Sequence, residues 1–168
     1  RADGGMIRGL VIREAEAKDH EAIARLVEAA FGQPDEAKLV ENLRANGDMV
    51  LELVATNEGE LVGHVAFSRL AVDRFDALAL APLAVLPGRQ RSGIGAALLE
   101  NAHHLLAERG ESLCLVLGDP AYYGRFGYAR DRAAGFESAY QCDALQALAW
   151  GEAPRTGRLN YPSAFQGL

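Results

Sequence analysis

Lysine, cysteine and long apolar runs are all scarce in this chain of 168 residues. Lysine occurs only at Lys18 and Lys38, and 23 acidic residues against 17 basic ones give a formal net charge of -6. Binding to nucleic acid requires clustered cations that neutralise phosphates, so this balance argues against a nucleic-acid partner. The longest strongly apolar stretch, residues 78–86, contains Pro82 and is far too short to cross a bilayer. We therefore expect no membrane partner either.

The cysteines indicate neither a disulfide framework nor a metal site. Cys114 lies in an apolar run and Cys142 in a polar connection, with no C-x-x-C pair and no histidine cluster at ligand spacing. We expect no bound metal, and Cys114 is interpreted as a small core residue. No signal peptide is visible, which favours a cytoplasmic protein. Residues 1–5 precede Met6 and are interpreted as a tag or an upstream extension.

Length and composition predict a single domain over residues 1–168. With 49% apolar and 24% charged residues, the composition is that of an ordinary soluble domain. A chain of this size buries roughly 70% of its unfolded surface, which is enough for one core without disulfides or metals. The acidic surplus favours a cationic amine over a nucleic-acid-linked one as the acceptor of a reaction.

Hydrophobic periodicity predicts strands and helices that do not alternate regularly. The predicted strands are residues 10–13, 49–56, 61–72, 78–86, 113–117 and 144–150. The predicted helices lie between Asp19 and Gly32, from Pro34 to Asn46, from Ile94 to Gly110, and over 120–126. This order favours a mixed α/β fold, in which helices cover both faces of a central sheet.

Several single residues in these elements carry further expectations. Pro82 cannot donate to a strand ladder, so it predicts a bulge or a pairing gap in the strand over 78–86. Asp19 and Asp119 are expected to cap the helices that follow them. His103 and His104 are expected on the solvated side of the long helix.

The segment over 85–96 joins the end of a strand to the start of a helix. Backbone N–H groups and the helix dipole converge there on one point, which suits a phosphate group. Gly93 and Gly95 let the backbone approach a ligand closely, and Arg89 and Arg91 place cations at the rim.

Two familiar phosphate-binding motifs do not fit this loop. A Walker loop needs Lys and then Ser or Thr where Ile94 and Gly95 stand. A dinucleotide fingerprint that began at Gly93 would need a small residue at Leu98, and it would follow the first strand of the fold. The loop therefore belongs to another class of phosphate site.

The pattern Q-R-S-G-I-G at 90–95 resembles the pyrophosphate loop of the GNAT superfamily of N-acetyltransferases. The string G-D-P-A-Y-Y-G-R-F-G-Y at 118–128 is similar to the Tyr-x-x-x-Gly-Phe element of that family, and together with N-Y-P-S-A-F at 160–165 it looks like the YhbS-like bacterial branch. The order of elements matches the family from about Leu10 to Trp150. The resemblance implies a GNAT-like acyl-CoA N-acyltransferase fold with a mostly antiparallel sheet of about six to seven strands.

The resemblance also implies that acetyl-CoA, as co-substrate, binds between the strands over 78–86 and 113–117. The irregularity at Pro82 would free backbone groups for the pantetheine arm; a mere pairing defect is the alternative. The expected cofactor contacts are Leu83, Ala84, Val85, Arg89, Gln90, Arg91, Ser92, Gly93, Ile94, Gly95, Ala96, Asp119 and Tyr123. Many relatives carry an Asn seven residues before the tyrosine, whereas a shorter connection here leaves Asp119 as the nearest polar candidate.

Transfer to an amine needs an acid that protonates the leaving thiolate and a base that deprotonates the amine. By resemblance Tyr123 is the general acid. Tyr122 is its rival, because adjacent residues on a helix point about 100° apart, and both tyrosines could instead be core residues. His64, Glu52, Asp76 or a water chain could serve as the base, although a lone histidine on a strand is more often structural.

The resulting hypothesis is an acetyl-CoA-dependent N-acetyltransferase that acts on a primary amine by direct transfer in a ternary complex. The alternative is a catalytically silent acyl-CoA-binding sensor or interaction module. The acceptor, a small molecule or a peptide, would be selected by the first two helices, the loop over 73–77 and the C-terminal segment. A polyamine, an aminoglycoside, an amino acid, a protein N-terminus and a lysine all stay open, and the last predicted strand is the candidate surface for a homodimer.

Overall fold

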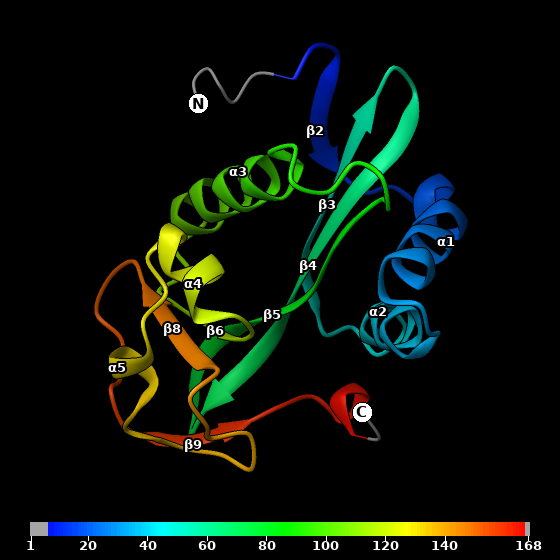
Figure 1. Ribbon diagram of the computed structural model, residues 1–168. Helices are drawn as coiled ribbons and strands as arrows, with labels where there is room; N and C mark the ends of the chain where they lie inside the picture. Colours follow the sequence, from blue (N-terminus) through cyan, green and yellow to red (C-terminus); the bar gives the residue numbers. More distant parts are fainter. Residues whose placement is uncertain (1–6, 167–168) are drawn as a thin grey trace.

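In the computed structural model, which describes residues 7–166, a twisted sheet separates two groups of helices (Figure 1). The strands are β2 (Leu10–Glu14), β3 (Met49–Asn57), β4 (Glu60–Val72), β5 (Phe75–Val85), β6 (Leu113–Leu117), β7 (Phe136–Glu137), β8 (Leu145–Ala149) and β9 (Gly157–Asn160). The helices are α1 (His20–Phe31), α2 (Asp35–Ala45), α3 (Ile94–Glu108), α4 (Pro120–Tyr123) and α5 (Arg130–Ala133), with 3-10 turns at Ala17–Asp19, Gly124–Phe126 and η3 (Ser163–Phe165). Residues 1–5, interpreted as a tag or an extension, lie outside the described residues.

Within the described residues the sheet has eight strands, in the order β2-β3-β4-β5-β6-β8, with β9 beside β4 and β7 beside β9. Along the main path only β5 and β6 run parallel, and α3 is the crossover that joins them. The sheet exceeds the expected six to seven strands because the short strands β7 and β9 lie in the tail, where the sequence has little periodicity. The mixed, mostly antiparallel fold with helices on both faces is confirmed.

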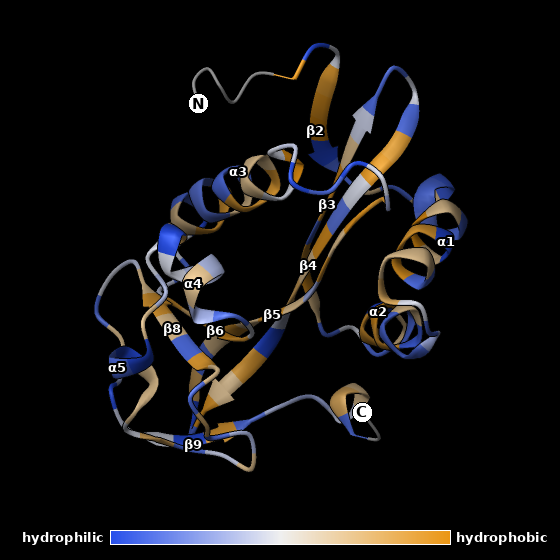
Figure 2. Ribbon diagram, viewed as in Figure 1, coloured by the Kyte–Doolittle hydropathy of each residue, from blue (hydrophilic) through white to orange (hydrophobic). Residues whose placement is uncertain are grey.

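The helices cover the two faces of the sheet with amphipathic surfaces. Figure 2 shows that α1, α2 and α3 each have a hydrophobic and a hydrophilic side. On one face α3 buries Ile94, Leu98, Leu99, Ala102 and Leu106 against β3, β4 and β5. On the other face α1 and α2 bury Ile23, Leu26, Val27, Leu39, Val40 and Leu43. Among residues 7–166, no helix is long and apolar enough to span a membrane.

Strand β5 contains the irregularity that Pro82 predicts. Val65 of β4 pairs with Leu83, and Phe67 pairs with Leu80, so β5 uses one residue more than β4 over the same interval. This extra residue is a β-bulge, which bends the strand that carries it. Beyond the pairs Leu78 to Cys114 and Ala79 to Leu115, β5 and β6 form no further ladder. The two strands therefore separate as β5 approaches the loop over 85–96.

The predicted loop over 73–77 is wrong. Residues 75–77 belong to β5, where Phe75 pairs with Val72 and Ala77 with Leu70. The chain reverses at Asp73 and Arg74, and Asp73 adopts the left-handed conformation with φ 52°. Aspartate tolerates that conformation better than most residues, so a two-residue turn is enough here. This turn lines neither of the hollows described below.

The predicted cap at Asp19 also differs in the structure. Its side chain makes no capping hydrogen bond to α1. Instead, the Asp19 carboxylate accepts the backbone N–H of Glu16 at 2.7 Å and pairs with the guanidinium of Arg13 at 2.7 Å. The hydrogen bond from Arg13 lowers the pKa of Asp19 to about 2. The 3-10 turn that precedes α1 therefore takes the carboxylate away from the helix.

Candidate active site

The loop after β5 forms a hollow at the N-terminus of α3. Arg91 and Gly93 adopt left-handed conformations, with φ 65° and 92°, and this kind of backbone forms concave anion sites. Glycine at 93 removes the steric penalty that a side chain would incur there. The first-turn N–H groups of α3 have no acceptor within the helix. The hollow, about 460 Å³, is lined by Leu83, Val85, Gln90, Arg91, Gly93, Gly95, Ala96, Tyr122 and Arg125.

This hollow fits a pyrophosphate group. A Cβ at Gly95 would stand 2.6 Å from the hydroxyl oxygen of Tyr122, so glycine leaves the space above the helix start open. Arg91 and Arg125 supply positive charge on its walls. The guanidinium of Arg125 lies 5.4 Å from the ring centroid of Tyr122, a cation–π contact that leaves its N–H groups free for an anion.

Seven of the expected cofactor contacts line this hollow: Leu83, Val85, Gln90, Arg91, Gly93, Gly95 and Ala96. The other six side chains do not. Ala84 and Ile94 are core residues, Ser92 bonds the carbonyl of Arg89, and Asp119 caps α4 by accepting the N–H of Ala121 at 3.0 Å. Arg89 donates to Asn57 at 3.0 Å, and Tyr123 lines a different cavity.

Sequence reasoning missed Tyr122 and Arg125 as members of this hollow. Both lie in the string at 118–128, and their spacing of three residues places them on the same side of a helical turn. That spacing is the signal that could have identified them. Tyr123, one residue after Tyr122, faces another side of the turn.

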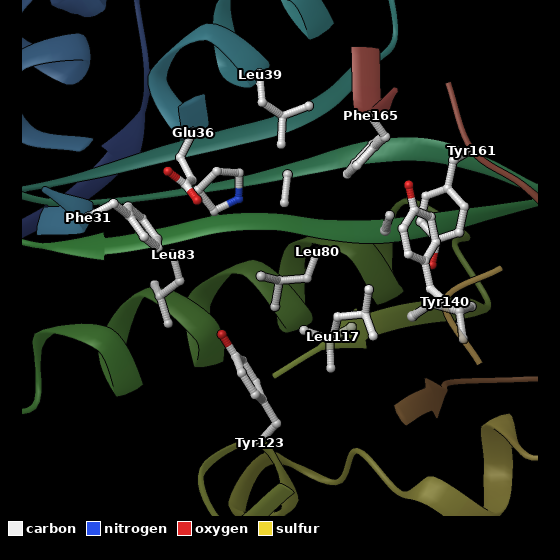
Figure 3. Close-up of a pocket in the computed structure, with 15 residues that line it drawn as sticks. Phe31, Glu36, Leu39, Leu80, Leu83, Leu117, Tyr123, Tyr140, Tyr161 and Phe165 are labelled. Atoms are coloured by element: carbon white, nitrogen blue, oxygen red, sulfur yellow. The ribbon is translucent and has the colours of Figure 1, made fainter. Parts of the chain in front are cut away.

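A second cavity, about 450 Å³, lies where β5 and β6 separate. Its lining reaches from α1, α2 and the C-terminal η3 on one face of the sheet to Tyr123 of α4 on the other (Figure 3). The lining residues are Phe31, Glu36, Leu39, Ala79, Leu80, Ala81, Pro82, Leu83, Leu115, Val116, Leu117, Tyr123, Tyr140, Tyr161 and Phe165. Leu83 lines both this cavity and the loop hollow. The opening made by the bulge therefore joins the two faces.

The two adjacent tyrosines divide between these spaces. Tyr123 directs its hydroxyl into the cavity between the strands (Figure 3), and Tyr122 is among the residues that line the loop hollow. A Cβ at Gly118 would stand 2.5 Å from a ring carbon of Tyr123, so this glycine makes room for the ring. Burial, followed by the proximity of Tyr122, raises the pKa of Tyr123 above its usual value. The hydroxyl is therefore protonated at neutral pH.

The three side chains considered as bases lie away from the second cavity. His64 is fully buried, and its Nε2 lies 2.8 Å from Glu52 Oε2. Arg44 of α2 donates to both oxygens of Glu52, at 2.9 Å and 2.7 Å. Burial tends to raise the pKa of Glu52, but His64 and Arg44 outweigh it and hold the pKa at about 2. Asp76 pairs with Ala71 in the β4–β5 hairpin and lines neither space.

Glu36 is the carboxylate that does line the cavity, and sequence reasoning missed it. It stands in the first turn of α2, where an acid is commonly found because it complements the helix dipole. Nothing in the local pattern separates it from its neighbour Asp35. Its position at the cavity depends on how α2 packs beside β5.

Behind Tyr123 lies a buried set of neutral polar groups. His103 Nε2 lies 2.9 Å from the Tyr128 hydroxyl, which in turn donates to the Cys114 sulfur at 3.4 Å. Burial lowers the pKa of His103 to about 4 and raises that of Cys114 to about 12. The expectation that His103 is solvated is wrong because Phe67, Tyr128 and Trp150 pack around it, whereas His104 is exposed as expected.

Comparison with known proteins identifies this arrangement. The family model described as an acetyltransferase (GNAT) domain matches residues 11–130. The chain belongs to the GNAT acetyltransferase family. It is 39% identical over 137 residues to the N-acetyltransferase YhbS of Escherichia coli (strain K12), covering 76% of this chain and 82% of that protein.

Solved structures agree with this result. The crystal structure of a GNAT family acetyltransferase from Brucella melitensis in complex with acetyl-CoA is 34% identical, with a TM-score of 0.81 over 94% of this chain and 98% of that chain. The structure of Escherichia coli YhbS in complex with CoA is 31% identical, with a TM-score of 0.86 over 95% and 93% of the two chains.

The resemblance to the GNAT superfamily and its YhbS-like branch is confirmed, and so is the prediction of an acetyltransferase. GNAT enzymes use acetyl-CoA as co-substrate and act on amine acceptors, so those two expectations are confirmed for the family. Among residues 7–166, no group of three or more His, Cys, Asp and Glu side chains could hold a metal ion.

Proposed function

We propose that the chain transfers the acetyl group of acetyl-CoA directly to a primary amine held in the cavity between β5 and β6. The observation that supports this proposal is that Leu83 lines both the loop hollow and this cavity, and that the Tyr123 hydroxyl is directed into the cavity. A co-substrate that starts at the loop and follows β5 would bring its thioester to the cavity. An amine that enters from the α1 and α2 face would meet it there.

The loop hollow would hold the phosphates of acetyl-CoA. The first-turn N–H groups of α3 would bind the pyrophosphate, with Arg91 and Arg125 adding opposite charge. The unpaired residues at the bulge of β5 would offer backbone groups to the amide-bearing pantetheine arm. Bound acetyl-CoA supplies a thioester, whose carbonyl carbon accepts a nucleophile.

The reaction balances with Tyr123 as a proton carrier. The ammonium first gives one proton to water, because only the uncharged nitrogen has a free lone pair. As the C–N bond forms and the C–S bond breaks, Tyr123 gives its proton to the sulfur, and the surplus proton on the nitrogen restores the tyrosine. The products are an amide and the free thiol of coenzyme A.

Direct transfer is favoured over an enzyme-bound acetyl group. Among the described residues, no cysteine, serine or lysine lines the cavity. Cys114 is fully buried, and its pKa of about 12 keeps the thiol protonated, which removes its nucleophilic form. The cavity therefore offers surfaces that bind and orient two substrates rather than a nucleophile.

The replacement Tyr123→Phe tests this assignment. We expect kcat at neutral pH to fall at least about tenfold, with the KM for acetyl-CoA changed less than about twofold, because the ring stays and only the proton donor is lost. Tyr122→Phe is the matched control, since the same hydroxyl is removed from the loop hollow. It should change the KM for acetyl-CoA more than kcat.

Release of coenzyme A thiol across a panel of primary amines is the measurement. An unchanged kcat in Tyr123→Phe would place the acid elsewhere. Binding of acetyl-CoA without thiol release for any amine would favour the silent sensor module over the enzyme. A single domain over 1–168, a cytoplasmic location and a homodimer through the last predicted strand stay predictions.

A further inference from the structure

Glu36 brings an uncompensated negative charge to the cavity. Its carboxylate accepts the side-chain amide of Gln33 at 3.1 Å and 3.2 Å, and among residues 7–166 it forms no ion pair with a Lys, Arg or His side chain. Glu52, on the same face of the sheet, is by contrast paired with both Arg44 and His64. Glu36 is thus free to bind a cation that enters the cavity.

Aromatic rings form the other end of the cavity. The ring centroids of Tyr140 and Tyr161 are 5.0 Å apart with an interplanar angle of 79°, and those of Tyr161 and Phe165 are 5.2 Å apart at 67°. Figure 3 shows these three rings at the opposite end from Phe31 and Glu36. Rings in edge-to-face contact present flat apolar surface on which another ring can pack. The cavity is therefore polarised, with a carboxylate at one end and aromatic surface at the other.

The remaining lining residues restrict what else could bind. Among the described residues, no lysine or arginine lines this cavity, so a carboxylate on the acceptor would find no opposite charge. A polyamine or an aminoglycoside would bring several positive charges to one carboxylate and leave the others among apolar side chains, at a high desolvation cost. The lining therefore suits a molecule with a single ammonium group and an apolar body.

We infer that the acceptor is an arylalkylamine, a primary monoamine joined by a short chain to an aromatic ring, with Glu36 holding the ammonium and Tyr140, Tyr161 and Phe165 contacting the ring. This inference rests on the proposed function, because it names the substrate class of the same cavity. Glu36 is then a specificity residue, which binds the protonated amine before the nitrogen loses its proton and attacks.

Four acceptors separate this class from the others. 2-Phenylethylamine carries one ammonium group and an aromatic ring. Phenylalanine differs from it by an added carboxylate, n-propylamine lacks the ring, and spermidine has several ammonium groups and no ring. We expect kcat/KM for 2-phenylethylamine to exceed that for each of the other three by at least about tenfold. A higher kcat/KM for phenylalanine or for spermidine would overturn the inference while leaving the proposed acetyl transfer intact.

Substitutions at Glu36 test the charge. Glu36→Gln should raise the KM for 2-phenylethylamine at least about tenfold, with the KM for acetyl-CoA within about twofold of the original value. Glu36→Asp, which keeps the charge, should recover part of the loss. Glu41→Gln is the matched control, because Glu41 is an exposed acid of α2 outside the cavity. Equal effects of Glu36→Gln and Glu41→Gln would contradict a role for Glu36.

Phe165→Leu tests the aromatic end. It replaces a ring by an apolar side chain and should raise the KM for 2-phenylethylamine several-fold while leaving that for n-propylamine unchanged. Calorimetric titration of 2-phenylethylamine into the protein saturated with coenzyme A measures binding without turnover. If no amine is acetylated but this titration shows binding that Glu36→Gln weakens, the proposed function fails and the acceptor site stands. If 2-phenylethylamine does not bind, the inference fails.

Discussion

The two faces of the sheet differ in the chemistry of their buried polar groups. On the α1 and α2 face, Arg44, Glu52 and His64 form a charged set in which Glu52 binds both partners. On the α3 and α4 face, His103 and Tyr128 belong to a neutral set surrounded by aromatic rings. The charged set is stable only while each buried charge keeps its partner. The neutral set is stable only while its groups carry no charge.

The loop hollow and the cavity between β5 and β6 also differ in charge. The loop hollow presents the first-turn N–H groups of α3 and two arginines, and it suits a polyanion. The cavity between β5 and β6 presents one carboxylate and apolar rings, and it suits a cation. A chain with a net charge of -6 can present both a cationic hollow and an anionic cavity, because the charge at each is set by the few residues that line it.

Removing one partner from the charged set should give the largest effect on stability. Arg44→Met leaves the Glu52 carboxylate, which is 9% exposed, with His64 alone. We expect the free energy of unfolding to fall by about 3 to 5 kcal/mol, because a buried charge loses its main counter-ion. Urea unfolding at neutral pH measures this loss.

The control for this variant is Arg25→Met, which removes an exposed pair on α1. Arg25 and Glu21 lie 2.9 Å apart but are 68% and 88% exposed, so water screens their attraction. The free energy of unfolding should change by less than about 0.5 kcal/mol. If both variants lost a similar free energy of unfolding, burial would not explain a difference in strength between the two ion pairs.

Acid should weaken the neutral set. The pKa of His103 is about 4 when folded and about 6.5 when exposed, so between these values the unfolded chain binds the extra proton. The contribution is fully present above about pH 6.5 and is lost as pH falls to about 4, by at most about 3 kcal/mol. Urea unfolding at a series of pH values should show a smaller acid-induced loss in His103→Gln than in the original protein.

His104→Gln is the matched control for the acid experiment, since His104 lies on the exposed side of the same helix. It should leave the pH dependence unchanged. Burial also lowers the pKa of His64, which adds a loss in the same direction, so the difference between His103→Gln and the original protein is the quantity to measure. Parallel pH profiles would refute the role of His103.

The smallest effects are expected for substitutions at two glycines, one beside the cavity and one beside the loop hollow. In Gly118→Ala the new Cβ meets the ring of Tyr123, and in Gly95→Ala it meets the hydroxyl of Tyr122. We expect Gly118→Ala to lower kcat by about tenfold, which is about 1.4 kcal/mol, and Gly95→Ala to raise the KM for acetyl-CoA several-fold with kcat nearly unchanged. Steady-state kinetics with both substrates varied measure these constants. If each variant changed kcat and the KM for acetyl-CoA equally, the separate roles of the cavity and the loop hollow would be contradicted.

Much of the shape of the loop hollow could be predicted because its signals are local. Gly93, Gly95 and the start of α3 lie within a few residues of each other, and Pro82 by itself predicts a bulge in its strand. The short strands β7 and β9 escaped prediction, because two to four residues are too few to establish a period of two. His103 was misplaced because helical periodicity does not reveal that Tyr128 and Trp150 pack over that side of α3.

The sequence by itself determined the family, the order of the elements and the glycine-containing loop before α3, since each rests on residues that are neighbours in the chain. Only the tertiary structure placed Tyr123 in the cavity and Tyr122 in the loop hollow, because two adjacent residues on one turn differ only in what they face. It also brought Glu36, Tyr140, Tyr161 and Phe165 to one cavity. These four come from segments far apart in the chain, and packing across the opened sheet, which no local pattern encodes, is what makes them neighbours.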